Sequence, residues 1–269
     1  MPIGVFDSGL GGLTVLQALQ KTMPDQSFIY FGDNANAPIG SKTEREITDL
    51  TMAATGRLFS LGCDLVILAC NTASAVALRA MQEFWVPADR RVLGVFVPVI
   101  EVLAGRSWAD RSPPLNGPSR SVALFATPAT VASGAFEREL GLRIKGTHVV
   151  SQPCPGLVAA LEAGEHDRAE NLVKAFVGDV LSRDPNVAAA VLGCTHYPLL
   201  QNVFARHLPV GTEILSQPDL VAESLRDYLI RHPRFRQKGS TQYLTSGDAT
   251  RVAAEARYLT GAAIGFTTI

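Results

Sequence analysis

Two cysteines stand in matching contexts far apart in the chain. Cys70 closes the apolar run "VILA" and is followed by Asn71 and Thr72. Cys194 closes the run "AVLG" and is followed by Thr195 and His196. Short apolar runs of this kind are typical of buried strands, and the polar residues after them mark a place where a helix can begin. The free N–H groups and dipole of a helix N-terminus favour a thiolate, so we predict a functional role for both cysteines.

Three kinds of chemistry would use these side chains. A Cys–His nucleophile would pair Cys194 with His196, two positions along and on the same side of a strand, but it leaves Cys70 unused. A metal site would draw on both cysteines, His196 and Asp7, although no closely spaced ligand pair anchors it. In two-base proton transfer, one thiolate removes a proton from a carbon atom and the opposite thiol returns one to the other face. A duplicated cleft would supply two opposed thiols, but residue types alone leave all three open.

A glycine-rich turn, "DSGLGG", follows the apolar segment 3–6. Such a turn before a helix binds anions through its N–H groups. Thr14 stands where a GxGxxG dinucleotide motif needs its last glycine, and no GxxxxGK[ST] motif occurs. We therefore expect the turn to hold a substrate carboxylate, with Ser8 donating a hydrogen bond. Asp7 would receive a substrate ammonium group or take part in proton transfer.

The remaining thiols and imidazoles show no comparable partners. We interpret Cys63 and Cys154 as small buried hydrophobic side chains. The other histidines are expected to be surface or structural residues: His148, His166, His207 and His232.

Strand-like apolar segments alternate with helical ones along the chain. Thr43 and Glu46 form a capping box at the start of one such helix. The segment 106–120 is rich in proline and serine and is expected to be an exposed loop. We expect strands at 3–6, 27–33, 64–70, 121–130, 147–154 and 188–196, and helices within 7–24, 43–62, 73–84, 157–183 and 249–261.

This alternation predicts an α/β protein with two pseudosymmetric domains, each a mostly parallel sheet flanked by helices. Ligands of such sheets bind at the carboxyl ends of the strands, where Asp7, Cys70 and Cys194 stand, so we expect the active site in the interdomain cleft. One lobe is expected to span 1–97 and 208–269, with the C-terminal segment returning to it, and the other 98–207.

Composition favours an ordinary globular enzyme. The chain has 269 residues, of which 47% are hydrophobic and 18% charged, and its net charge is -1. Nothing in this balance favours binding to nucleic acid or to an anionic membrane. We expect no membrane span, because no long apolar run occurs, and no signal peptide. Four cysteines without a CxxC pair indicate reduced thiols and a cytoplasmic location.

Four motifs in order resemble those of the glutamate racemases, the cofactor-independent enzymes of the aspartate/glutamate racemase superfamily: "IGVFDSGLGGLTVL", "YFGDNANAPIGSKT", "ACNTASA" and "LGCTHYPLL". The resemblance extends from Ile3 to the segment 243–252. It implies a two-domain fold that binds glutamate in its cleft and interconverts L- and D-glutamate for peptidoglycan synthesis. It also implies a homodimer, no cofactor and no metal.

The resemblance further implies the roles of individual residues. Cys70 would deprotonate D-glutamate and Cys194 would deprotonate L-glutamate, with Asp7 and His196 assisting them. Glu162 matches an acidic position of the family. Ile39 departs from it, since a tyrosine is common there. The implied substrate-binding residues are Asp7, Ser8, Ile39, Gly40, Asn71, Thr72, Thr127, Thr130, Thr195 and His196.

Three other functions stay open at this point. A racemase for aspartate or another small amino acid would share the two cysteines and differ in pocket size. A cysteine-dependent amidohydrolase would form an acyl-enzyme on Cys194. A non-catalytic amino-acid-binding protein would never exchange the α-hydrogen of its ligand.

Overall fold

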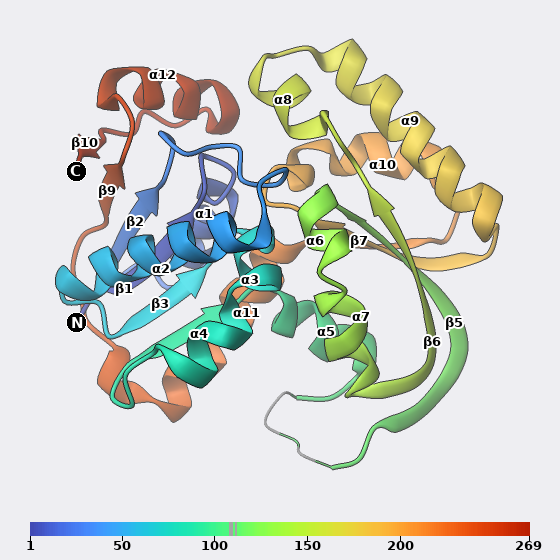
Figure 1. Ribbon diagram of the computed structural model, residues 1–269, viewed down its shortest axis with the longest axis horizontal. Helices are drawn as coiled ribbons and strands as arrows, with labels where there is room; N and C mark the ends of the chain where they lie inside the picture. The colour runs from blue at the N-terminus through green and yellow to red at the C-terminus, as the bar shows by residue number, and fades with distance from the viewer. Residues whose placement is uncertain (108–109, 111) are drawn as a thin grey trace.

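The computed structural model of the chain describes residues 1–107, 110 and 112–269. These residues form two sheets, one with six strands and one with four, and every pair of neighbouring strands within them is parallel. Figure 1 shows the sheets side by side, with the C-terminal segment packed beside the N-terminal one. The predicted α/β class with two parallel sheets is confirmed.

The first sheet has the strand order β10-β9-β2-β1-β3-β4. Its strands β2, β1 and β3 are buried segments covered on both faces, as a parallel sheet requires. We call this sheet and its helices the first lobe. Its strands are β1 (Ile3–Asp7), β2 (Phe28–Gly32), β3 (Leu65–Leu68), β4 (Arg91–Gly94), β9 (Gln242–Thr245) and β10 (Thr267–Thr268). One face packs on α1 (Leu13–Thr22), α11 (Gln217–Arg231) and α12 (Ala249–Thr260), and the other on α2 (Glu44–Ser60), α3 (Asn71–Val76) and α4 (Leu78–Phe84).

The second sheet has the strand order β6-β5-β7-β8. We call this sheet and its helices the second lobe. Its strands are β5 (Leu115–Ala126), β6 (Ile144–Pro153), β7 (Val187–Gly193) and β8 (Glu213–Leu215). One face packs on α8 (Leu157–Glu162), α9 (His166–Arg183), the 3-10 turn η1 (Tyr197–Leu200) and α10 (Gln201–His207), and the other on α5 (Phe96–Ala104), α6 (Pro128–Ala132) and α7 (Ala135–Gly141). A second 3-10 turn, η2 (Pro233–Phe235), follows α11 in the first lobe.

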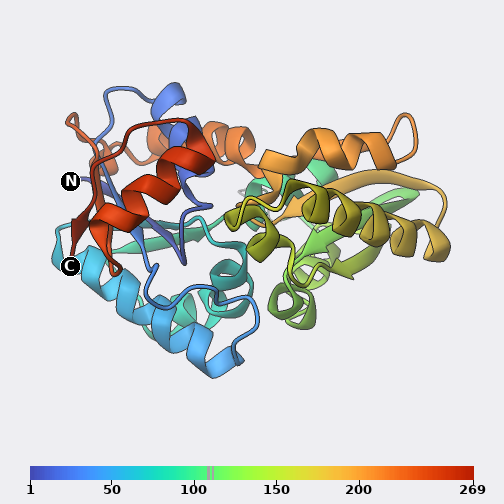
Figure 2. The ribbon, with the colours of Figure 1, turned by 90° about the horizontal axis from the view of Figure 1, so that it is seen from above.

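The two lobes repeat one topology. In the first lobe β1 lies between β2 and β3, and in the second β5 lies between β6 and β7. Each central strand is therefore a switch point, where the chain leaves on one side and returns on the other. Ligands of open parallel sheets bind at the carboxyl end of such a point. Residues that follow β1, β3, β5 and β7 line one cavity, and Figure 2 shows the two lobes side by side.

Most predicted elements occur close to their expected bounds. The capping box at the start of α2 is present, with Thr43 accepting from the Glu46 N–H and the Glu46 carboxylate accepting from Thr43. The predicted helix over 73–84 is two helices that meet at Ala77, and the one over 157–183 is interrupted between Glu162 and His166. The helical character of both segments is predicted correctly, but the break within each of them is not.

The predicted loop over 106–120 is wrong at its C-terminal end. Strand β5 already begins at Leu115, which pairs with Ile144, and the register shifts between Asn116 and Arg120. Proline is tolerated in a strand at such an irregularity, so pairing with β6 prevails over the turn-like composition. Residues 108, 109 and 111 of the expected loop lie outside the described residues.

The lobe boundaries can be compared with sheet membership. Strand β8 lies within the segment 208–269, which the sequence analysis assigns to the first lobe, yet it pairs with β7 of the second sheet. The next helix, α11, packs on α1 of the first lobe. We therefore propose that the chain returns to the first lobe between β8 and α11, later than residue 208.

Among the described residues, no helix has both the length and the apolar character needed to cross a bilayer.

Candidate active site

A cavity of about 170 Å³ lies where the strand ends of the two sheets meet. Both lobes contribute to its wall, and most of the predicted site residues line it. Asp7 and Thr130 do not, because each lies just behind the wall. The predicted residues that line the cavity are Ser8, Ile39, Gly40, Cys70, Asn71, Thr72, Thr127, Glu162, Cys194, Thr195 and His196.

Cys70 is the residue before α3 and has extended backbone angles, as an N-cap requires. Its Sγ lies 3.4 Å from the Ser8 Oγ at the end of β1. Burial and the neighbouring Asp7 carboxylate raise the pKa of the Cys70 thiol to about 12, although the Ser8 hydroxyl works in the opposite direction. This group is therefore a thiol at neutral pH.

Cys194 faces the same cavity from the end of β7, close to the buried His196 ring. The His196 Nε2 lies 3.0 Å from Glu162 Oε1, although the N–H does not point at the oxygen, so this contact is an ion pair without hydrogen-bond geometry. Burial lowers the pKa of His196, but its hydrogen bond with Cys194 and its attraction to Cys194 and Glu162 outweigh burial and raise the pKa to about 10. A cation at neutral pH therefore stands beside the Cys194 sulfur.

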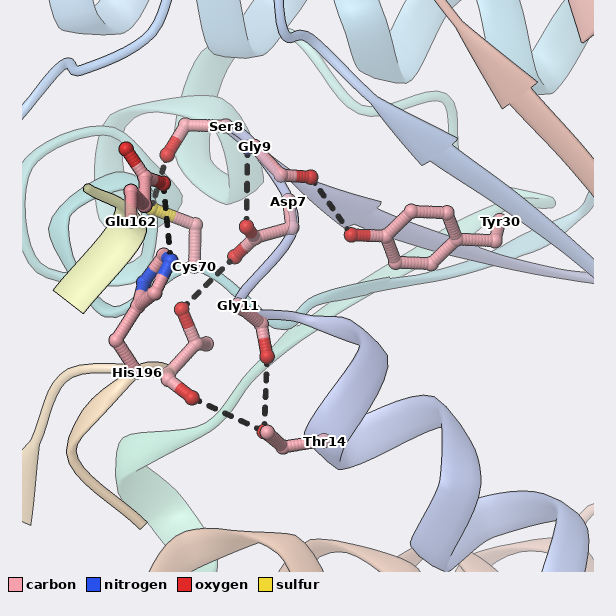
Figure 3. Close-up of polar contacts among 10 residues, drawn as sticks. Asp7, Ser8, Gly9, Gly11, Thr14, Tyr30, Cys70, Glu162 and His196 are labelled. Carbon is pink, nitrogen blue, oxygen red and sulfur yellow. Dashed lines mark hydrogen bonds and ion pairs between the residues drawn. The ribbon is translucent and has the colours of Figure 1, made fainter. Parts of the chain in front are cut away.

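Asp7 is buried between the two lobes rather than exposed to the cavity. Its carboxylate accepts from the Gly9 N–H at 3.0 Å and from the Thr195 hydroxyl at 3.3 Å (Figure 3). Burial raises the pKa of Asp7, while the charge of His196 acts against this rise. The carboxylate thus connects the turn after β1 to the turn after β7.

The glycine-rich turn is shaped by close contacts. A Cβ on Gly11 would lie 2.5 Å from the His196 Nδ1 and would overlap the Thr195 hydroxyl. The turn is also held by Tyr30, whose hydroxyl donates to the Gly9 carbonyl at 2.8 Å. Thr14 at the start of α1 donates to the Thr195 carbonyl at 3.1 Å. The turn therefore positions the residues after β7 as well as any ligand.

Three threonine hydroxyls form a triangle across the lobes. Thr72 on α3 lies 2.9 Å from Thr127 and 3.2 Å from Thr130, and the latter two are 2.9 Å apart. Thr127 also caps α6 by accepting from the Thr130 N–H. The cavity wall beside Cys70 is thus built from both lobes at once.

Several lining residues were missed by the sequence analysis. Cys154 packs in the second-lobe core, as expected, but it also lies in the wall directly after β6. Its position at the carboxyl end of a strand is the signal that singled out the other two thiols, and it would have pointed here too. Ile39 lines the cavity but also packs in the first-lobe core. The other missed lining residues are Gly9, Ala37, Pro38, Ser41, Pro128, Pro155, Gly156, Val158 and Ala159.

The geometry bears on the three chemistries differently. Two thiols from corresponding strands of different sheets line one cavity, which suits proton removal on one side of a carbon atom and return on the other. A Cys–His pair is present on one wall only. In the part of the chain that the structure describes, no three histidine, cysteine or carboxylate side chains are grouped as metal ligands.

Comparison with known proteins places the chain in a family. The family model described as Asp/Glu/Hydantoin racemase matches residues 13–224. Glutamate racemase from Cereibacter sphaeroides is 55% identical over 257 residues, which cover 95% of each chain. The crystal structure of glutamate racemase isoform RacE1 from Bacillus anthracis superposes with a TM-score of 0.88 at 25% identity, covering 100% of this chain and 97% of that one. The crystal structure of glutamate racemase from Francisella tularensis in complex with D-glutamate superposes with a TM-score of 0.85 at 26% identity, covering 100% of this chain and 97% of that one. This chain belongs to the Asp/Glu/Hydantoin racemase family.

Proposed function

We propose that this protein is a glutamate racemase that interconverts L- and D-glutamate by two-base proton transfer. The observation that carries the proposal is the pair of thiols, Cys70 and Cys194, at corresponding strand ends of the two lobes and in one cavity. The likeness to glutamate racemases over nearly the whole chain supports the choice of substrate. In a bacterium, D-glutamate made in this way supplies peptidoglycan synthesis.

The proton balance of the proposed reaction is simple. In this direction Cys70 first gives up its thiol proton to solvent. The resulting thiolate takes the α-hydrogen of D-glutamate as a proton, and the Cys194 thiol gives its proton to the opposite face, which leaves L-glutamate, a Cys70 thiol and a Cys194 thiolate. The reverse direction exchanges the two roles. The His196 cation would stabilise negative charge as it develops on the neighbouring Cys194 sulfur.

The carbanion is the demanding part of this reaction, because an amino-acid α-hydrogen is a very weak acid. The reaction as proposed uses no cofactor, so stabilisation comes from fixed dipoles and from exclusion of water. Ser8, Asn71, Thr72, Thr127 and Thr195 are the polar groups in the wall that would bind the substrate carboxylates and ammonium. Asp7 and Thr130 would act from behind the wall, and Ile39 and Gly40 would add backbone contacts.

The direct test starts from each glutamate enantiomer in turn and follows the change of its circular dichroism signal with time. Because the enantiomers have equal free energy in water, kcat/KM must be the same in both directions. Incorporation of solvent deuterium at the α-carbon, first in the product enantiomer, would support two-base transfer. Inversion of aspartate but not glutamate would favour the aspartate racemase. No α-exchange at all would leave a binding protein, and an adduct on Cys194 would indicate the amidohydrolase.

We further propose that the protein works in the cytoplasm as a homodimer. Size-exclusion chromatography with light scattering tests the second point, since a mass near 28.7 kDa would identify a monomer.

A further inference from the structure

Gln217 is a buried polar residue that none of the sequence motifs includes. It is 1% exposed and begins α11, one residue after the second-lobe segment that ends at Ser216. Its carboxamide pairs reciprocally with that of Asn71. The Asn71 Nδ2 donates to Gln217 Oε1 at 2.7 Å, and the Gln217 Nε2 donates to Asn71 Oδ1 at 2.6 Å. The two residues are 146 positions apart, so only the tertiary structure brings them together.

This pairing fixes the orientation of Asn71. A carboxamide carries two N–H donors and an oxygen with two lone pairs. The reciprocal bonds use one donor and one lone pair of Asn71. Because the Gln217 Nε2 also faces the Val95 carbonyl oxygen at 3.5 Å, these contacts together settle which end of each amide carries the nitrogen. One N–H and one lone pair remain on a side chain that lines the cavity next to Cys70. Without Gln217, the amide would be free to rotate and to present either end.

Gln217 also lies where the chain crosses between the lobes. Its Nε2 is 3.5 Å from the carbonyl oxygen of Val95. Val95 packs in the first-lobe core and the next residue, Phe96, packs in the second, so the outgoing connection passes here. The returning connection passes between Leu215 in the second-lobe core and Val221 in the first. One side chain therefore contacts both connections and a residue of the cavity wall.

We propose that Gln217 is a positioning residue that orients the Asn71 carboxamide for the substrate and ties it to both connections between the lobes. Gln217 does not line the cavity, so it acts through Asn71. The identity of the ligand rests on the proposed glutamate racemase function, whereas the positioning of Asn71 does not.

The kinetic test uses Gln217→Leu, which keeps a similar size and removes every hydrogen bond. We expect the KM for both enantiomers to rise about tenfold, the effect of one misplaced hydrogen bond, while kcat stays within about twofold. In an Asn71→Ala background, Gln217→Leu should add nothing further to KM, because its partner is gone. Additive effects in the double variant, or an unchanged KM in the single one, would overturn the proposal.

The matched control is Gln26→Leu. Gln26 is also buried and bonded to backbone, through Ser27 and Gln237, but it lies outside the cavity wall. We expect this variant to lower Tm and to leave KM unchanged. If Gln217→Leu does not fold, Gln217→Glu replaces it, because that side chain keeps the acceptor for the Asn71 Nδ2 and loses the donor to Asn71 Oδ1. Its KM should also rise.

A spectroscopic readout separates this inference from the function. In protein labelled with ¹⁵N-asparagine, the Asn71 side-chain amide signal is identified by its loss in Asn71→Ala. We expect its protons to exchange with solvent at least about tenfold faster in Gln217→Leu than in wild type. An unchanged signal would overturn the positioning role even if the wild type racemises glutamate. If the wild type does not racemise glutamate but the signal changes, the proposed function fails and the positioning role stands.

Discussion

At the scale of single residues, the candidate site is asymmetric although the fold that carries it is duplicated. Cys70 is neighboured by the Ser8 hydroxyl and the buried Asp7 carboxylate. Burial and the carboxylate raise its pKa to about 12, while the hydroxyl acts against this rise. Cys194 is neighboured by His196, whose pKa is raised to about 10 by contacts with Cys194 and Glu162 that outweigh burial. The two thiols therefore start the reaction in different electrostatic surroundings.

Removal of either thiol should abolish turnover in both directions. Each direction of the proposed reaction uses one sulfur as base and the other as acid, so Cys70→Ala and Cys194→Ala should each lower kcat by roughly 10³-fold or more. Circular dichroism with each enantiomer measures this loss. Cys63→Ala is the control, because this buried thiol packs in the first-lobe core outside the cavity. Full racemisation by either active-site variant would end the two-base account.

Glu162 should set the protonation of His196. Glu162→Gln removes the carboxylate 3.0 Å from Nε2, so we expect the pKa of His196 to fall from about 10. The raised pKa stabilises the folded protein fully below the ordinary pKa of 6.5, and this contribution is lost as the pH rises through about 10. The variant should therefore lose Tm relative to wild type at pH 7 and lose less at pH 10. NMR titration of the imidazole measures the shift directly.

The matched control is Glu170→Gln. Glu170 lies 3.7 Å from another histidine, His207, on the outer helices of the second lobe. This change should leave the His196 titration where it is. Equal titration of His196 in Glu162→Gln and wild type would contradict the assigned role of Glu162.

At the scale of elements, the turns after the strands matter more than the strands themselves. The turn between β1 and α1 brings Gly11 against the residues after β7. Gly11→Ala should push His196 and Thr195 away, so we expect kcat/KM to fall by more than about tenfold while the protein still folds. Gly178→Ala is the control, because its added methyl meets nothing inside α9 and should raise stability by about 0.5–1 kcal/mol. Unchanged kinetics in Gly11→Ala would show that the turn can yield.

At the scale of the whole molecule, contacts between the lobes surround the cavity. The carboxylate of Asp7 and the threonine triangle join residues of different lobes, and the Asn71–Gln217 pair lies where the chain returns to the first lobe. A further contact joins α12 to the start of α9, where the Tyr258 hydroxyl lies 3.0 Å from His166 Nε2. These two helices approach each other across the gap between the lobes (Figure 1). Motion of one lobe relative to the other would have to break this outer contact.

The outer contact should affect binding more than chemistry. Tyr258→Phe removes only the hydroxyl, so we expect a rise in KM of about two- to fivefold with little loss of Tm, because both side chains are exposed. Tyr243→Phe is the control, since its hydroxyl accepts from Gln20 within the first lobe. Steady-state kinetics on both enantiomers tests the difference. Equal KM values for the two variants would argue that the contact between Tyr258 and His166 has no part in holding the two lobes together over the bound substrate.

The sequence by itself determined the fold class, the alternation of elements and the two thiols. Apolar runs that end in Cys70 and Cys194 are local patterns, and a parallel sheet gathers the carboxyl ends of its strands at one edge. Local composition also placed the capping box of α2. It was wrong for the start of β5, because pairing of Leu115 with Ile144, 29 positions away in the chain, outweighed a turn-like composition there.

Only the tertiary structure decided what surrounds the thiols. It placed Asp7 behind the wall, Cys154 in it, and Gln217 against Asn71 from 146 positions away. It also assigned β8 to the second sheet. The physical reason is common to all four. Burial and hydrogen-bond partners depend on how distant segments pack, and hydrophobic periodicity within a segment carries no information about its partner.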